Sequence, residues 1–107
     1  MNSITLIGQI QGNARLIDTS KDKTIKFYEF ILKVPRENHI KGEQEYDYFV
    51  IKHMINVLQE KFNLYDKTTI VVQGTIESHL FDDNIRSAEY DVWAEKIIYL
   101  TTRKTTQ

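Results

Sequence analysis

The sequence of 107 residues contains no cysteine, one proline and four widely spaced glycines. Without cysteine, the chain can form neither a disulfide nor a thiolate metal site. The scattered glycines exclude a glycine-rich loop that cradles phosphates. No apolar run approaches the roughly 18 residues that a membrane helix needs. The start, MNSITLIG, lacks the basic and long apolar regions of a signal peptide. We therefore expect a cytoplasmic protein without a membrane partner.

An excess of positive charge is also missing. The chain has 14 Lys and Arg residues against 15 Asp and Glu residues, and its formal net charge is −1. Proteins that bind nucleic acid nonspecifically usually show a basic excess. Binding depends on the charge of one face, however, and bases can also be held by stacking on aromatic rings. The composition argues against strong nonspecific DNA binding by charge and leaves a stacking surface open.

Signatures of catalysis and of metal binding are absent as well. The three histidines, His39, His53 and His79, form none of the short spacings that bind zinc. Asp82 and Asp83 are adjacent carboxylates in an expected turn, where such residues are usually solvated. No serine lies in a nucleophile elbow. We therefore expect a protein that is not an enzyme and that carries no metal or other cofactor.

What the sequence does contain is a series of short segments rich in β-branched and aromatic residues. Such residues favour a pleated surface, and the segments show the period of two that is typical of strands. The expected strands cover residues 3–11, 25–34, 46–54, 69–80 and 88–100. The chain length fits one domain with one core. We expect this domain to span residues 1–100 and to be followed by a short polar tail, residues 101–107.

Residues 55–65, between the third and fourth expected strands, have a different period. Apolar residues at Ile55, Leu58 and Phe62 form one stripe of a helix of about three turns. The resulting order β-β-β-α-β-β is that of an OB-fold, an all-β five-stranded barrel with one helix. We expect the helix to close one open end of the barrel with these three side chains.

A closed barrel fills its interior with one parity of each strand. The residues predicted to point inward are Leu6, Phe30, Leu32, Ile51, Val72 and Ile76. Glycine at Gly8 and Gly74 fits strands that bend tightly. The segment 46–54, YDYFVIKHM, is apolar at both parities. If its Phe49 and Ile51 point inward, an outward stripe remains that a ligand or a second subunit must cover. This stripe consists of Tyr48, Val50, Lys52 and Met54.

Five motifs occur in order along the chain: MNSITLIGQI (1–10), FILKVPR (30–36), GEQEYDYFVI (42–51), VVQGTIESHLF (71–81) and EYDVWAEKIIYL (89–100). Together they resemble the bacterial single-stranded DNA-binding protein (SSB) family, including tail-less members of the PriB type. The resemblance implies an OB-fold that binds single-stranded DNA without sequence specificity and without catalysis. It also implies a homo-oligomer, a dimer or tetramer, assembled through the first strand. In the family, an acidic-hydrophobic tail recruits replication and repair proteins, and residues 101–107 do not match it.

Outward parity and the resemblance together predict nine DNA-binding residues. Rings and a thioether for stacking come from Phe27, Tyr48, Met54 and Phe81, and cations for phosphates from Lys33, Arg36, Lys41, Lys52 and Arg86. Stacking on an aromatic ring contributes about 1–3 kcal/mol per base. Packing against a second subunit is the alternative role for Tyr48 and Met54. For the single tryptophan, Trp93, packing against a subunit is the expected role and base stacking the alternative. The loop over residues 35–45 is either a DNA clasp or a solvated mixed-charge loop.

The sequence thus predicts nonspecific binding of single-stranded DNA in replication, recombination, repair or the maintenance of mobile elements. Replication or recombination proteins are possible further partners. The alternative is an SSB-like assembly module of the primosome-adaptor type with weak or lost DNA binding. The even charge balance and the scarcity of arginine favour this alternative. Gln9, Gln11 and Asn13 of the first strand are either solvated or form an edge-to-edge dimer, which exposed strand edges favour.

Overall fold

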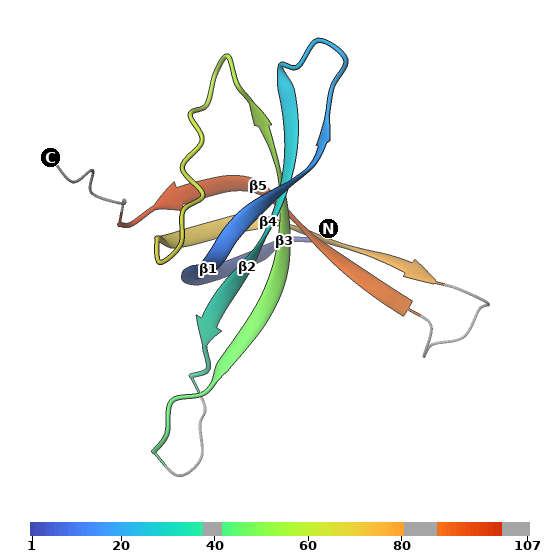
Figure 1. Ribbon diagram of the computed structural model, residues 1–107. Coiled ribbons are helices and arrows are strands. Elements are labelled where there is room, and N and C mark those ends of the chain that lie inside the picture. The colour runs from blue at the N-terminus through green and yellow to red at the C-terminus, as the bar shows by residue number, and fades with distance from the viewer. Residues whose placement is uncertain (38–41, 81–87, 102–107) are drawn as a thin grey trace, which may run out of the picture.

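Five strands make up the computed structural model, which describes residues 1–37, 42–80 and 88–101. They are β1 (Ile4–Thr19), β2 (Ile25–Pro35), β3 (Tyr46–Asn56), β4 (Thr69–Leu80) and β5 (Ala88–Tyr99). The strands form a closed barrel in the order β1-β2-β3-β5-β4 (Figure 1). β3 and β5 pair in parallel, and the other neighbours pair antiparallel. The predicted all-β five-stranded barrel of OB-fold type is confirmed.

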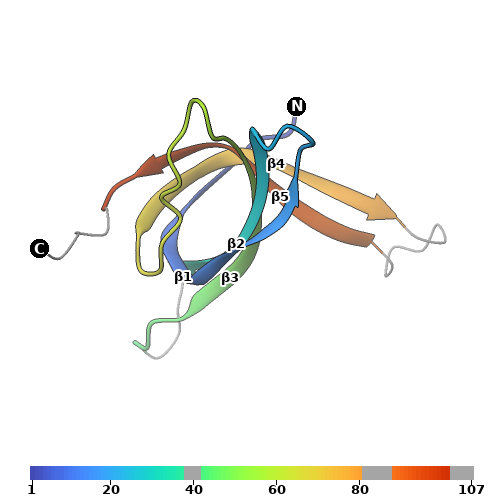
Figure 2. The same cartoon turned by 45° about the horizontal axis from the view of Figure 1, so that its top comes forward.

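β1 extends beyond the predicted segment 3–11 because its two halves pair with different strands. Residues Ile4–Gln9 pair with β4, and residues from Gln9 onward pair with β2. The register with β2 shifts between Gln11 and Arg15, a stretch that contains Gly12 with a φ of 78°. A bulge of this kind bends a strand sharply. The bend lets one strand close the ring, which Figure 2 shows from a second direction.

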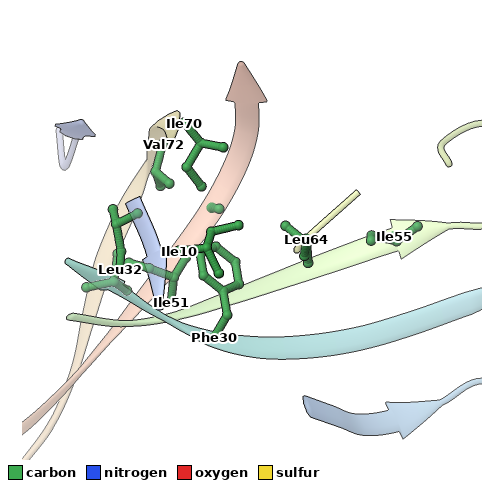
Figure 3. Close-up of a cluster of buried hydrophobic side chains, with 10 residues drawn as sticks. Ile10, Phe30, Leu32, Ile51, Ile55, Leu64, Ile70 and Val72 are labelled. Carbon is green, nitrogen blue, oxygen red and sulfur yellow. The ribbon is translucent and has the colours of Figure 1, made fainter. Parts of the chain in front are cut away.

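The core lies inside this ring (Figure 3). The buried hydrophobic residues that form it are Ile10, Phe30, Leu32, Ile51, Ile55, Leu64, Ile70, Val72, Val92 and Ala94. Leu6 and Ile76 are partly buried and pack against this cluster. All six residues predicted to point inward therefore belong to the core or line it. Full burial of a Leu, Ile or Phe side chain contributes about 1.5–3 kcal/mol, which holds this parity inside.

Gly8 and Gly74 occupy two points where the backbones of neighbouring strands approach closely. A Cβ atom at Gly74 would overlap the carbonyl oxygen of Trp93 on β5, and one at Gly8 would overlap that of Lys33 on β2. The register between β4 and β5 shifts at Gly74, so the close approach coincides with a bulge. Both positions therefore require glycine for the reason the sequence suggested, the tight curvature of the barrel.

The predicted helix over residues 55–65 is wrong. Ile55 and Asn56 complete β3, and the chain then makes one turn in which the Asn56 carbonyl oxygen accepts hydrogen bonds from the N–H groups of Gln59 and Glu60. The Asn56 side chain accepts another from the N–H of Leu58, at 3.0 Å. Asparagine side chains compete with helical hydrogen bonds in this way, and a short isolated helix is marginal. No helix occurs in the described residues, hence none long and apolar enough to cross a membrane.

The segment after β3 packs against the barrel core through side chains that match the predicted ones only in part. Leu58 is 79% exposed, whereas Leu64 is buried. Phe62 packs against the core, with its ring centre 4.9 Å from that of Tyr28. Leu58 lies in the turn that Asn56 caps, and no helix follows, so its helical spacing does not direct it to the core. Ile55, which belongs to β3, and Phe62 thus pack in or against the core as predicted, although not from a helix, and Leu58 does not.

The same segment occupies the free side of β1. The backbone of Ile10 exchanges two hydrogen bonds with Lys67 and Thr68, at 2.7 and 2.9 Å. The Gly12 N–H donates to Asp66 Oδ1 at 2.7 Å. The edge of β1 near Gln9, Gln11 and Asn13, where we expected a dimer contact, is thus covered by this segment of the same chain at Ile10 and Gly12. The expected tail, residues 101–107, lies outside the described residues except for Thr101, and its separation from the domain stays a prediction.

Candidate nucleic-acid interface

The outward side chains of β2 and β3 form one continuous surface, the β2–β3 face. It consists of Phe27, Glu29, Ile31, Lys33 and Pro35 from β2 and of Tyr46, Tyr48, Val50, Lys52 and Met54 from β3. These residues lie directly opposite one another in the antiparallel register, from Phe27 with Met54 to Pro35 with Tyr46. Opposed side chains on one face of an antiparallel pair are close neighbours. The outward parity predicted for the YDYFVIKHM stretch is confirmed.

An exposed apolar strip runs along the middle of the β2–β3 face. Tyr48, Val50 and Met54 are 56%, 54% and 50% exposed. Ile31, which lies opposite Val50, is also exposed. Apolar side chains that gather in one exposed patch commonly mark a binding surface. This strip offers flat or flexible apolar groups to a ligand over most of the length of β3.

One end of the face combines a cation with two aromatic rings. The Lys33 Nζ lies 4.0 Å from the centre of the Tyr46 ring, a cation–π contact. Lys33 is also directly opposite Tyr48 in the register. A hollow opens beside them where β1 and β2 diverge, and its walls include Ile7 and Gln9. This corner can hold a phosphate near Lys33 and a base against an aromatic ring.

The other end of the face has a second aromatic pair. The rings of Phe27 and Trp93 meet edge to face, with centres 6.4 Å apart. Lys52 lies opposite Trp93 in the parallel pairing of β3 with β5, and its Nζ is 5.8 Å from the indole ring centre. A shallow hollow is lined by these three side chains together with Ile17 and Asp18. Trp93 was not among the predicted binding residues, although its outward parity was the signal that could have included it.

Lys52 does not present a free charge. Its Nζ forms an ion pair of 3.1 Å with Asp91 Oδ1, and Asp91 Oδ2 lies 3.2 Å from His79 Nε2. The pKa of Asp91 is held below its ordinary value, first by the hydrogen bond from Lys52 and also by His79. The ammonium of Lys52 is therefore matched by a carboxylate that stays ionised.

Arg36 is also occupied, just beyond the end of β2. Its guanidinium forms ion pairs with Asp47 at 2.8 Å and with Glu45 at 3.0 Å. The hydrogen bond and charge of Asp47, followed by those of Glu45, raise the pKa of Arg36. The Arg36 N–H also donates to the Glu45 carbonyl oxygen at 2.8 Å. This arrangement joins the ends of β2 and β3, so Arg36 has a structural role in addition to any contact with a ligand.

The structure brings five of the nine predicted residues onto one face: Phe27, Lys33, Tyr48, Lys52 and Met54. Arg36 lies next to that face, within its ion pairs. Three predicted residues, Lys41, Phe81 and Arg86, lie outside the described residues, as do His39, Asp82 and Asp83.

No family model matches the chain, and neither does any curated protein. Solved structures do match. The dimeric N-terminal domain of PriB from Thermoanaerobacter tencongensis is 26% identical, with 94% of this chain and 97% of that chain covered and a TM-score of 0.61. The Plasmodium falciparum SSB in complex with single-stranded DNA is 17% identical, with 94% and 96% covered and a TM-score of 0.69.

The SSB from Thermus aquaticus is also 17% identical, with a TM-score of 0.68. The match covers 96% of this chain but 52% of the Thermus chain. The neighbours thus include both SSB and PriB proteins over nearly the whole described barrel. They confirm the resemblance that the five sequence motifs indicated: this chain is SSB/PriB-like.

Proposed function

We propose that this protein binds single-stranded DNA without base-sequence specificity, through the β2–β3 face. The action is binding alone, by base stacking and phosphate contacts, without catalysis. The observation that supports it best is the exposed row of Tyr48, Val50 and Met54, with an aromatic ring and a lysine at each end. A barrel of the same fold has been solved with single-stranded DNA bound.

Stacking is the main source of affinity in this proposal. Tyr48 is the most exposed ring on the β2–β3 face. Phe27 and Trp93 form a second stacking platform beside Met54, which lies six residues after Tyr48 on β3. At about 3.3 Å per residue these platforms lie about 20 Å apart, and several bases fit between them. The apolar side chains of Val50, Ile31 and Met54 line the path. Because every base has a π-face, such a surface tolerates any sequence.

Phosphate contacts come chiefly from Lys33. Within the described residues Lys33 forms no ion pair, and its ammonium lies over the Tyr46 ring. Lys52 and Arg36 contribute less in this proposal, because carboxylates already neutralise them. Lys41, Phe81 and Arg86 remain predictions from the sequence.

We further propose that the protein is a homo-oligomer that holds single strands during replication, recombination, repair or mobile-element maintenance in the cytoplasm. The PriB neighbour is dimeric.

Intrinsic fluorescence tests the proposal directly, because Trp93 is the single tryptophan and lies at the edge of the β2–β3 face. The protein is titrated with oligo-dT at low salt, and with oligo-dA, oligo-dC and a duplex of the same length. Saturable quenching by all three single strands, weaker for the duplex and reversed by salt, is the expected result. Absence of binding at tens of micromolar, by fluorescence and by mobility shift, would refute the proposal.

A second candidate function is a protein-assembly module with little DNA affinity. The ion pairs of Arg36 and Lys52 and the net charge of −1 favour it, since they leave few cations for phosphates. The same titration, combined with light scattering, separates the two functions. A stable oligomer that binds none of the oligonucleotides supports the assembly module, whereas salt-sensitive binding to all single strands supports the first proposal.

A further inference from the structure

The ion pair between Lys52 and Asp91 lies where a bound strand would cross from β3 to β5. Lys52 is directly opposite Glu29 on β2 and Trp93 on β5. The side chains of Lys52 and Asp91 are 26% and 29% exposed, so water reaches both only partly. A partly shielded ion pair is weakened by salt less than a fully exposed one. Asp91 is therefore a persistent neighbour of this lysine.

The position of Asp91 is set by the β4–β5 hairpin arm, which projects from the barrel (Figures 1 and 2). On the outer side of the arm Asp91 is opposite Glu77, and His79 is opposite Glu89. The contact of 3.2 Å between His79 Nε2 and Asp91 Oδ2 leaves the other carboxylate oxygen directed to Lys52. The arm thus delivers a carboxylate, within an acidic surface, to the edge of the β2–β3 face.

A phosphate that approaches Lys52 meets an ammonium that is already neutralised and a negative charge beside it. We propose that Asp91 competes with the phosphates of single-stranded DNA for Lys52 and thereby sets the affinity and the salt dependence of binding. Lys33, whose ammonium faces a ring instead of a carboxylate, is the lysine available to phosphate in the unmodified protein. The inference rests on the proposed function, because it assumes that a single strand follows the β2–β3 face.

The test is a comparison of salt dependence. For single strands, the logarithm of the binding constant falls with the logarithm of the salt concentration by about 0.7 per phosphate neutralised. Asp91→Asn keeps the shape of the side chain and removes its charge, which releases Lys52. We expect oligo-dT to bind several-fold more tightly at low salt and the slope to steepen by about 0.7. Because Asp91 already neutralises Lys52, Lys52→Met in the unmodified chain flattens the slope by much less than the 0.7 of a full phosphate contact, and it cancels the added slope in the Asp91→Asn background.

Glu77→Gln is the matched control, because it removes one negative charge from the same face of the arm at a residue with no contact to Lys52 in the described structure. Its slope stays that of the unmodified protein. If Asp91→Asn and Glu77→Gln act alike, or if Asp91→Asn weakens binding, the inference is overturned while the proposed function stands. If Lys52→Met alone flattens the slope by the amount of one phosphate, Lys52 was never blocked, and the inference also fails.

These outcomes stay separate from a failure of the proposed function. If neither the unmodified protein nor any variant binds oligo-dT, the proposed function and the inference are both refuted. Thermal unfolding followed by circular dichroism confirms that each variant is folded. The Lys52→Met measurement in the otherwise unmodified chain does not depend on the stability of Asp91→Asn, so a full flattening of the slope there overturns the inference even if that variant does not fold.

Discussion

The ammonium of Lys33 lies 4.0 Å from the centre of the Tyr46 ring, and Tyr48 lies directly opposite the same lysine. β2 thus supplies the charge and β3 the two rings. A cation–π contact at an exposed site contributes about 0.5–1 kcal/mol, which positions the ammonium without neutralising it. Lys52 and Arg36 contrast with Lys33, because each of them is paired with a carboxylate. Among the described residues, the β2–β3 face and the adjoining Arg36 therefore present one cation without a carboxylate partner, Lys33, and two that have one.

Replacement of Tyr48 tests the stacking surface. Tyr48→Ala removes an exposed ring, and about 1–3 kcal/mol per stacked base corresponds to a loss of roughly 5- to 150-fold in affinity for oligo-dT. Tyr48→Phe retains the π-face and binds nearly as well as the unmodified protein. Fluorescence titration gives the dissociation constants. Ile98→Ala, an exposed residue paired with Val71 on another side of the barrel, is the control without effect. Unchanged affinity of Tyr48→Ala would remove Tyr48 from the site.

Replacement of Lys33 tests the phosphate contact. Lys33→Gln removes the charge and should flatten the salt dependence of the logarithm of the binding constant by about 0.7, with several-fold weaker binding at low salt. Lys33→Arg keeps the charge and the slope. Lys96→Gln, at an exposed lysine opposite Gln73 of β4, changes the net charge equally and leaves the slope as it was. Equal slopes for Lys33→Gln and Lys96→Gln would show that Lys33 contacts no phosphate.

Two glycine replacements differ in their predicted cost. Gly74→Ala places a Cβ atom against the Trp93 carbonyl, so the backbone of two strands must move, and we expect a loss of about 3 kcal/mol of unfolding free energy, the upper end for overpacking. Gly12→Ala meets no atom within 4 Å and suffers only from its φ of 78°, at about 1–2 kcal/mol. Urea unfolding measures both values. Similar losses at the two positions would contradict the close approach of β4 and β5.

Ionisation of Tyr99 lowers the stability of the barrel at alkaline pH. Burial, with a further contribution from the charge of Glu60, raises the pKa of its hydroxyl to about 12. The unfolded chain loses this proton near pH 10, so the folded state holds it more tightly. The resulting stability is complete below pH 10 and is lost as the pH rises from about 10 to about 12.

Comparison with Tyr99→Phe isolates this effect, because the other tyrosines are common to both proteins. The difference in unfolding free energy between the unmodified protein and Tyr99→Phe should fall with rising pH by at most about 2–3 kcal/mol, at 1.36 kcal/mol per pKa unit. Urea unfolding at a series of pH values measures it. Parallel stability curves from pH 9 to pH 12 would contradict the raised pKa of Tyr99.

Within the strands, the direction of the core and outward side chains could be predicted from the sequence, because the period of two and the closure of the barrel leave little freedom. Phe30, Ile51 and Val72 are buried, and Tyr48 is exposed, as expected. Side chains alternate between the two faces of a strand, so one residue correctly assigned to the inside fixes the direction of its neighbours on that strand. The outward surface of β2 and β3 follows from the same rule.

The turn after β3 could not be predicted in this way. Ile55, Leu58 and Phe62 have helical spacing, and the outcome is decided by hydrogen bonds to Asn56 and by burial of Leu64. Spacing alone cannot separate one stripe of a helix from a turn followed by an extended segment.

The ion pair between Lys52 and Asp91 also could not be predicted from the sequence. It depends on the parallel register of β3 and β5, two strands separated in the chain by all of β4. The same register brings Trp93 beside Phe27. Charges and rings that meet across such a pairing are visible only once the barrel is closed.

The divided pairing of β1 has a consequence for the order of folding. Its first half pairs with β4, so Ile4 lies opposite Gly74, although the second half already has β2 beside it. During synthesis the hairpin of β1 and β2 can form early, whereas Ile4–Gln9 has no partner for its β4 pairing until β4 has left the ribosome. Contacts between distant parts of a chain slow folding. We therefore expect the ring to close late and the start of β1 to stay an unpaired strand, open to pairing with a second chain, until β4 is in place.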